Sequence, residues 1–347
     1  MIREKSENSR DLSIQDQILI LRGDILNDNM TNTTNLSLQI LRGGCCLFIC
    51  LNHCSFFNRY SFGEIGVEFF IILSGLLSAL NADKHNHLRR SYFIDKIKKL
   101  CPLYWIITLF VFAVGMFVPQ LFSSMVFDGK TLIASLLFIP GNTFILYPGW
   151  TLTYFLEFYL IYFIADKLFN KRDLNASIII VVLVIVGAIL DICFSGNVFS
   201  KYANPIMLEF VYGIALYHIL NKVKLKNNNI SIFVAVVLTV LVFFNYNKYL
   251  GLRWIVPSLI VCIIIACVYG YTFTGKTAKL LASIGNISFT IYILHPVIIR
   301  PLDKIIIKII GSDCYPIYFV GVIAIVVITV IICYGVNKIF RKIHLVY

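Results

Sequence analysis

The chain has 347 residues, of which 59% are hydrophobic and 14% are charged, and its net charge is +12. Soluble domains contain about 45–50% apolar residues, so this composition excludes an ordinary soluble protein and predicts one embedded in a lipid bilayer. The positive charge is explained by the loops of a membrane protein, so we expect no nucleic-acid partner.

The N-terminal residues 1–36 are polar and are predicted to form a cytoplasmic extension, because they contain no apolar run long enough for a signal peptide. Residues 37–347 are predicted to form one all-α membrane domain. A shorter apolar run at 131–147 contains Ile139-Pro140-Gly141 and is predicted to be re-entrant or interfacial. Ten apolar segments of the domain are each long enough to cross a bilayer as a helix, namely 38–57, 62–80, 101–120, 150–167, 176–194, 203–220, 230–246, 251–271, 283–300 and 317–337.

The basic residues predict how these segments are oriented, because Lys and Arg accumulate on the cytoplasmic side of a membrane. With the N-terminus inside, only eight of the 30 Lys and Arg residues fall in outer loops. This distribution predicts ten membrane spans with both termini in the cytoplasm. The eight outer residues are Arg59, Lys130, Lys201, Lys248, Arg253, Arg300, Lys304 and Lys308.

Arg42 and His53 lie eleven residues apart on the first predicted span. Eleven residues of an α-helix turn through about 1100°, so both side chains face the same way, separated by about 16 Å along the axis. Ionisable groups inside a bilayer are costly and mark candidate functional sites. This spacing suits a long anionic molecule that is bound by its phosphates at one end and reacts at the other, as acyl-CoA would.

In the predicted topology, the ionisable side chains form two tiers. The cations Arg42, Lys96 and Lys99 lie at the inner face and suit phosphate groups. Imidazole and carboxyl groups lie in the outer half, and an imidazole beside a carboxylate is a common general base. The members of the outer tier are His53, Glu68, Glu157, Glu209 and His295.

Polar residues also recur at helical spacing on two of the predicted spans. Such faces must contact protein or a water-filled cavity, because lipid cannot satisfy their polar groups. These faces line an acceptor site or channel, or alternatively form hydrogen bonds that hold the helices together. The stripes are Trp150, Tyr154 and Glu157 on one span, and Gly285, Ser288, Tyr292 and His295 on another; with Glu209, all of these except Gly285 are candidates for the acceptor site or channel.

The ten cysteines do not suggest a metal site or a disulfide framework. Most of them fall inside predicted spans, and no Cys–Cys or Cys–His spacing resembles a zinc site. Buried cysteine behaves as a small hydrophobic residue, so we expect no bound metal.

Six motifs follow one another between residues 37 and 300. They are Leu41-Arg42-Gly43 followed by His53; Gly66-Val67-Glu68-Phe69-Phe70-Ile71-Ile72-Leu73-Ser74-Gly75; Lys96 to Pro102 with Leu103 and Tyr104; Gly149-Trp150-Thr151-Leu152 leading to Phe158-Tyr159-Leu160; Glu209-Phe210 with Gly213; and Gly285, Ser288-Phe289, Tyr292 and Leu294-His295-Pro296. In this order they resemble the acyltransferase-3 family of polytopic membrane acyltransferases, which modify sugars and cell-surface polysaccharides.

The resemblance implies a role for each part of the site. His53 is implied to be the general base for an acceptor hydroxyl, or alternatively the group that accepts the acyl group itself, with Glu68 as its partner acid. Arg42, Lys96 and Lys99 are implied to bind acyl-CoA, with acetyl-CoA the expected co-substrate and no cofactor bound permanently.

Two features depart from the pattern of the family. Its paired arginines are lysines here, which keep the charge but lose the bidentate geometry toward phosphate. Phe155 stands where the family often has a glutamate. Glu157 is offset from that position by about 200° around the helix, so it does not replace the missing acid.

The expected function is transfer of an acyl group, acetyl above all, from cytoplasmic acyl-CoA to a hydroxyl of an exported or cell-surface glycan, or of a lipid-linked sugar, at the bacterial cytoplasmic (inner) membrane. A transporter or flippase of lipid-linked glycan would also have many spans and buried charges. It would not explain inner cations combined with an outer imidazole–acid cluster. An inactive acyltransferase-like scaffold is a third class, which the lysines and Phe155 would allow.

Overall fold

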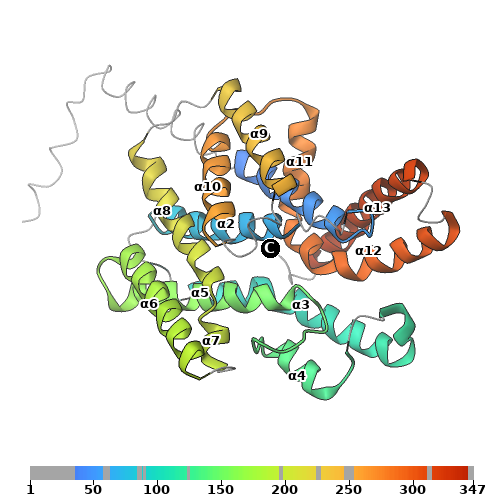
Figure 1. Cartoon of the computed structure of the whole chain (residues 1–347), viewed down its shortest axis with the longest axis horizontal. Coiled ribbons are helices and arrows are strands. Elements are labelled where there is room, and N and C mark those ends of the chain that lie inside the picture. The colour runs from blue at the N-terminus through green and yellow to red at the C-terminus, as the bar shows by residue number, and fades with distance from the viewer. Residues whose placement is uncertain are drawn as a thin grey trace, which may run out of the picture.

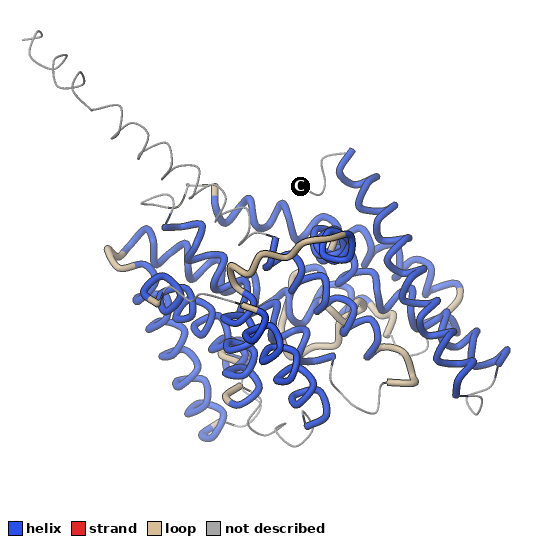
Figure 2. Tube along the Cα trace, turned by 90° about the horizontal axis from the view of Figure 1, so that it is seen from above, coloured by secondary structure: helices blue, strands red, loops and turns tan. Residues whose placement is uncertain are grey.

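The computed structural model describes residues 36–57, 63–83, 88, 91–122, 126–194, 198–223, 228–245, 254–310 and 315–342. Within these ranges the chain is mainly helical and contains no strand (Figure 1). Figure 2 shows the described helices connected by loops. Every cysteine in the described ranges is a free thiol. The N-terminal extension predicted for residues 1–36 lies outside the described residues except for Leu36.

Each predicted span contains a described helix. The first is Leu36–Asn52, followed by α2 (Gly63–Asp83), α3 (Tyr92–Phe117), η2 (Pro119–Phe122), α4 (Gly129–Leu136), α5 (Gly149–Leu168), α6 (Arg172–Cys193), α7 (Val198–Tyr202), η3 (Pro205–Met207), α8 (Leu208–Lys222), α9 (Asn229–Asn245), α10 (Val256–Val268), α11 (Lys276–Asn286), α12 (Ser288–Ile310) and α13 (Tyr315–Lys342). The region predicted to be re-entrant holds the short helix α4 and then a non-helical stretch up to α5.

Long apolar helices make this a multi-pass membrane protein. Among the described residues, five helices are long and apolar enough to cross a bilayer, and the count is six if α11 and α12 form one bent span. Three shorter apolar helices, Leu36–Asn52, α9 and α10, fall below the roughly 20 residues that a straight crossing needs. The structure therefore supports several crossings, and the number ten stays a prediction.

The continuous span predicted at 283–300 is wrong. Helix α11 ends at Asn286, α12 begins at Ser288, and the two helices meet at an angle of 75°. Gly285 belongs to α11, so it does not share a helical stripe with Ser288. The break coincides with a close crossing of the first helix, whose backbone at Gln39 occupies the place that a β-carbon of Gly285 would take. The chain turns at this close crossing although its apolar character continues.

Helix α2 lies at the centre of the bundle and buries most of its residues in the main apolar core, while one face lines a cavity. It crosses α8 at Gly75 and Gly213, where a β-carbon on either glycine would collide with the backbone of the other helix. Phe158 of α5 stacks on Phe210 of α8, with ring centroids 4.2 Å apart and planes 9° apart. These contacts fix α2, α5 and α8 relative to one another, and two of these helices carry walls of the site.

Candidate active site

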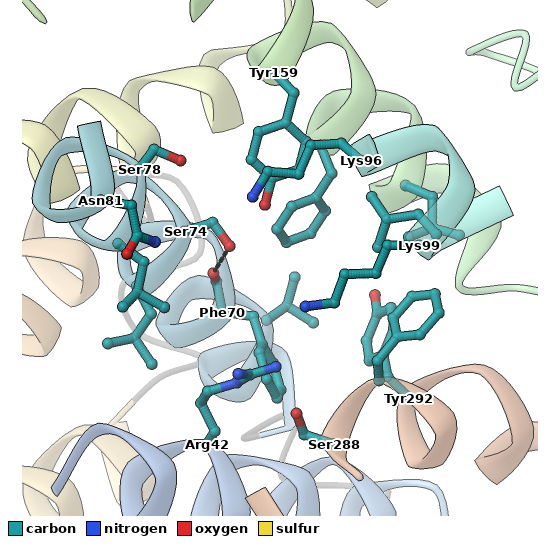
Figure 3. Close-up of a pocket in the computed structure, with 17 residues that line it drawn as sticks. Arg42, Phe70, Ser74, Ser78, Asn81, Lys96, Lys99, Tyr159, Ser288 and Tyr292 are labelled. Atoms are coloured by element: carbon teal, nitrogen blue, oxygen red, sulfur yellow. Dashed lines mark hydrogen bonds between the residues drawn. The ribbon is translucent and has the colours of Figure 1, made fainter. Parts of the chain in front are cut away.

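The three cations of the inner tier surround one cavity of about 280 Å³. Arg42 reaches it from the first helix, and Lys96 and Lys99 reach it from α3 (Figure 3). In Figure 3 the nitrogen atoms of these side chains point into the space between the helices. The structure therefore brings together the residues that the sequence grouped only by their depth in the membrane.

Lys96 is held at this cavity by two aromatic rings. Its Nζ lies 4.4 Å from the ring centroid of Tyr159 on α5 and 5.2 Å from that of Tyr92 at the start of α3. The face of an aromatic ring attracts a cation, so these contacts place the ammonium group without neutralising its charge.

Helix α12 supplies the opposite wall of the cavity through Ser288, Phe289 and Tyr292. The hydroxyl of Tyr292 is hydrogen-bonded to Thr151 near the start of α5. Ser288 Oγ is buried, and within the described chain it has no hydrogen-bond partner. This wall therefore presents a polar atom that is available to a bound molecule.

Phe155, the residue that departs from the family pattern, also lines the cavity. Its ring packs edge-on against Phe210, with centroids 5.4 Å apart. The wall is therefore apolar at the position where the family often has a glutamate. Glu157 does not line the cavity; its Oε2 is buried and, among the described residues, has no hydrogen-bond partner.

His53 lies one residue beyond the last residue of the first helix. Its backbone N–H is 3.3 Å from Ile49 O and 3.2 Å from Cys50 O, so the turn continues the helix almost to this point. The imidazole contacts the ring of His295, with centroids 4.6 Å apart, and the ring of Tyr147, with centroids 6.2 Å apart. The expected placement of His53 on the Arg42 helix therefore holds to within one residue.

His295 lies one turn after Tyr292 on α12 and is 1% exposed. Its Nδ1 is 3.2 Å from Ile291 O, and its Nε2 is buried without a hydrogen-bond partner in the described part of the chain. The rings of Tyr292 and His295 have centroids 5.9 Å apart. Tyr292 thus connects the basic cavity to the pair of histidines.

Glu68 and Glu209 are both completely buried, on α2 and α8 respectively. The described ring contacts of His53 are with His295 and Tyr147, and the pairing of Glu68 with His53 stays a prediction. Glu209 Oε1 accepts a hydrogen bond of 3.4 Å from Ser258 Oγ on α10. Both acids therefore lie inside the bundle, out of contact with solvent.

An aromatic row leads away from His53. Tyr147 contacts Trp150, and Trp150 contacts Tyr154, with centroids 6.2 Å apart in each case. The Tyr154 hydroxyl donates a hydrogen bond of 3.0 Å to Lys201 O. Trp150 and Tyr154 were predicted from the sequence. Tyr147 was not, because its only signal is its place two residues before the Gly149-Trp150 motif.

A group of charged residues that the sequence analysis also missed holds the chain just before α3. Asp166 Oδ2 accepts a hydrogen bond of 3.1 Å from the Leu88 N–H, and Lys167 Nζ donates one of 2.7 Å to Leu88 O. Arg172 pairs with Asp166 at 3.0 Å. This clamp fixes the approach to the helix that carries Lys96 and Lys99.

Comparison with known proteins identifies the family of the chain. A family described as an acyltransferase domain matches residues 35–338. The chain belongs to the acyltransferase-3 family. The match covers all six motifs, so the basic cavity and the two histidines lie within the acyltransferase domain.

The acyltransferase domain also resembles a curated protein. The exopolysaccharide production protein ExoZ of Rhizobium meliloti (strain 1021) is 27% identical over 169 residues, which are 46% of this chain and 51% of the relative. The match therefore spans about half the length of that relative. No solved structure matches the chain.

Proposed function

We propose that this member of the acyltransferase-3 family is an O-acyltransferase of the bacterial cytoplasmic (inner) membrane. It moves an acetyl group from cytoplasmic acetyl-CoA to a hydroxyl of an exported glycan. The observation that carries the proposal is the single cavity lined by Arg42, Lys96 and Lys99, whose wall at Tyr292 leads to the His53–His295 pair.

In this proposal the donor lies along the axis from Arg42 to His53. The three cations hold the phosphates of acyl-CoA, since Lys and Arg are the usual partners of phosphate. The flexible arm of the donor passes Ser288 and Tyr292, and its thioester reaches His53. The distance of about 16 Å along the first helix suits such an extended molecule.

In the proposed reaction, His53 acts as the general base. His53 takes the proton of the acceptor hydroxyl, and the resulting oxygen nucleophile attacks the thioester carbonyl. The C–S bond breaks, the acetyl group remains on the acceptor oxygen, and the CoA thiolate leaves with the proton returned by the imidazole. Glu68 is proposed to support this site from α2, between Val67 and Phe70, which line the cavity.

The acceptor is proposed to be an exopolysaccharide, a lipopolysaccharide or a lipid-linked precursor of one of them. The name of the ExoZ relative supports the first. Exposed aromatic faces beside the base suit the apolar faces of sugar rings, and Tyr147 is 52% exposed. Trp150, Tyr154, Glu157 and Glu209, with Ser288, Tyr292 and His295, remain the proposed lining of the acceptor site or channel.

The proposal is tested with purified protein in liposomes that receive labelled acetyl-CoA and exopolysaccharide acceptor. We expect label to appear in the glycan in step with release of CoA, and to depend on His53. A flippase would move a lipid-linked glycan with no consumption of acetyl-CoA, and an inactive scaffold would do neither. Either result would overturn the proposal.

The proposed topology has ten spans with both termini in the cytoplasm. Single cysteines in a variant without reactive native thiols test it. An impermeant thiol reagent applied to intact cells should label Lys130→Cys and should not label Lys98→Cys. The opposite pattern would place the cations of the cavity on the outer side, where cytoplasmic acyl-CoA cannot reach them.

A further inference from the structure

This inference rests on the proposed function and concerns what orients its base. A histidine that acts as a general base normally has a second group that fixes which ring nitrogen carries the hydrogen. For His53 the described contacts provide an imidazole, that of His295. We propose that His295 is the positioning residue of the base: its Nε2 accepts a hydrogen bond from the His53 ring, and the other nitrogen of His53 takes the proton of the acceptor.

The first step concerns the hydrogen on His295. Its Nδ1 lies 3.2 Å from the carbonyl oxygen of Ile291. A carbonyl oxygen only accepts hydrogen bonds, so Nδ1 must carry the hydrogen and donate it. In a neutral imidazole the remaining nitrogen, Nε2, then carries the lone pair. The main chain of α12 therefore decides the tautomer of His295 and makes Nε2 an acceptor.

The second step concerns the environment of that acceptor. His295 is 1% exposed, and Nε2 has no hydrogen-bond partner within the described part of the chain. A buried polar atom without a partner costs free energy, and each such atom in a native structure calls for an explanation. A hydrogen bond to Nε2, donated by a ligand or by a neighbouring side chain, would provide that explanation.

The third step identifies the donor. The described ring contacts of His295 are with Tyr292 and His53. The Tyr292 hydroxyl is engaged with Thr151, whereas His53 lies in a turn beyond the end of its helix and is only partly buried. The centroid separation of 4.6 Å and the 50° angle between the planes place the His53 ring within reach of Nε2 after a rotation of its side chain.

The resulting chain of hydrogen bonds has one direction. Ile291 O accepts from His295 Nδ1–H, His295 Nε2 accepts from the N–H of His53, and the second nitrogen of His53 accepts the proton of the acceptor hydroxyl. The positive charge that forms on His53 is then stabilised by the lone pair of His295. Because this help is given only as the proton moves, it should raise kcat and leave the affinity for acyl-CoA unchanged.

Three variants of His295 test the proposal. His295→Leu removes the acceptor and should lower kcat by about 10²-fold or more, the size of effect typical of impaired general-base catalysis, with the KM for acetyl-CoA unchanged. His295→Gln offers its Oε1 at about the position of Nε2 and should restore at least about a tenth of the lost rate. His295→Asn keeps a donor for Ile291 O, but its side chain is too short to place an acceptor at the position of Nε2. It should therefore be as slow as the leucine variant.

A matched control and a binding measurement complete the experiment. His218→Gln, at an exposed histidine of α8 that pairs with Asp173 at 2.8 Å, should retain the wild-type kcat. Binding of CoA, measured by calorimetry on each purified variant, should be unchanged and shows that the variants are folded. If His295→Leu does not bind CoA, the test depends on comparing kcat between His295→Asn and His295→Gln.

The outcomes separate this inference from the proposed function. If wild-type protein transfers no acetyl group, the proposed function fails. If the wild type is active and leucine or asparagine at 295 leaves kcat unchanged, only the inference fails. Equal losses for glutamine and asparagine would also overturn it, because a purely structural role would give no rescue through the acceptor atom.

Discussion

The ammonium group of Lys96 lies 4.4 Å from the ring centroid of Tyr159. This contact joins α3 to α5 at the edge of the basic cavity. A lysine is a compact charge on a flexible stem, without the planar fork of arginine. The aromatic face therefore supplies the orientation that the side chain itself lacks.

Removing the ring should weaken donor binding without affecting the chemical step. Tyr159→Leu is expected to raise the KM for acetyl-CoA several-fold, because a cation–π contact contributes about 0.5–2 kcal/mol, and to leave kcat near the wild-type value. Tyr159→Phe keeps the ring face and should behave like the wild type. A loss of kcat in both variants would show that the phenol has another role.

The cations themselves should act on donor binding. Arg42→Ala, Lys96→Ala and Lys99→Ala should each raise the KM for acyl-CoA, because they are expected to contact phosphates that are remote from the reacting carbonyl. Lys98→Ala is the matched control, since Lys98 is exposed and does not line the cavity. If the three alanine variants and the control give the same acyl-CoA dependence, the basic residues reflect membrane topology only.

Lys96→Arg and Lys99→Arg restore the residues typical of the family. We expect donor use to be preserved or tightened, because a guanidinium group binds phosphate in a bidentate manner. Steady-state KM values for acetyl-CoA measure the effect. A strong rise in KM would mean that the cavity fits only the slimmer lysine head.

His53→Ala should abolish transfer while the protein remains folded and inserted. Loss of a general base typically costs 10²–10⁴-fold in rate. Glu68→Gln keeps the shape of a completely buried side chain and should give a severe but incomplete loss, because Glu68 supports the site without carrying the proton. Near-normal transfer by His53→Ala would refute the mechanism.

The crossing of α2 and α8 makes a prediction about stability. Gly75→Ala and Gly213→Ala each place a methyl group against the backbone of the other helix, at Phe210 and Ile72 respectively. Neither backbone can move aside, so each change should destabilise the protein by about 1–3 kcal/mol. Thermal unfolding in detergent measures this.

The control for that prediction is Gly335→Ala on α13. No atom lies within 4 Å of a β-carbon at this position, and alanine favours a helix over glycine by about 1 kcal/mol. This variant should be neutral or slightly stabilised. Equal destabilisation at all three glycines would contradict the steric argument.

The sequence predicted the helices and the basic cavity because both depend on patterns along the chain. Apolar length predicted a helix in each of the ten segments, and the depth of Arg42, Lys96 and Lys99 placed them at one level. Depth says nothing about rotation around a helix axis. The sequence therefore could not predict which ring packs against His53, and the structure places His295 there.

The break between α11 and α12 was also beyond the reach of a sequence pattern. Apolar residues continue across Ile287, and the turn coincides with a close contact between Gly285 and Gln39 of a helix that lies far away in the chain. Tyr147 and the Asp166 clamp were missed for a related reason. They lie in or beside connections between helices, where periodicity carries no information.

The same break bears on how a water-soluble donor reaches the inside of a membrane protein. Helix ends leave some carbonyls and N–H groups without helical partners; here the Ile287 N–H bonds back to Ile284 O, and lipid cannot supply partners for the other groups. Non-helical backbone at that depth is tolerated only where protein or water surrounds it, and Ser288, the first residue of α12, lines the basic cavity. In the proposed function, an aqueous opening at this break on the cytoplasmic side would admit the donor from that side, and the acyl group would cross the bilayer without the alternating-access cycle of a transporter.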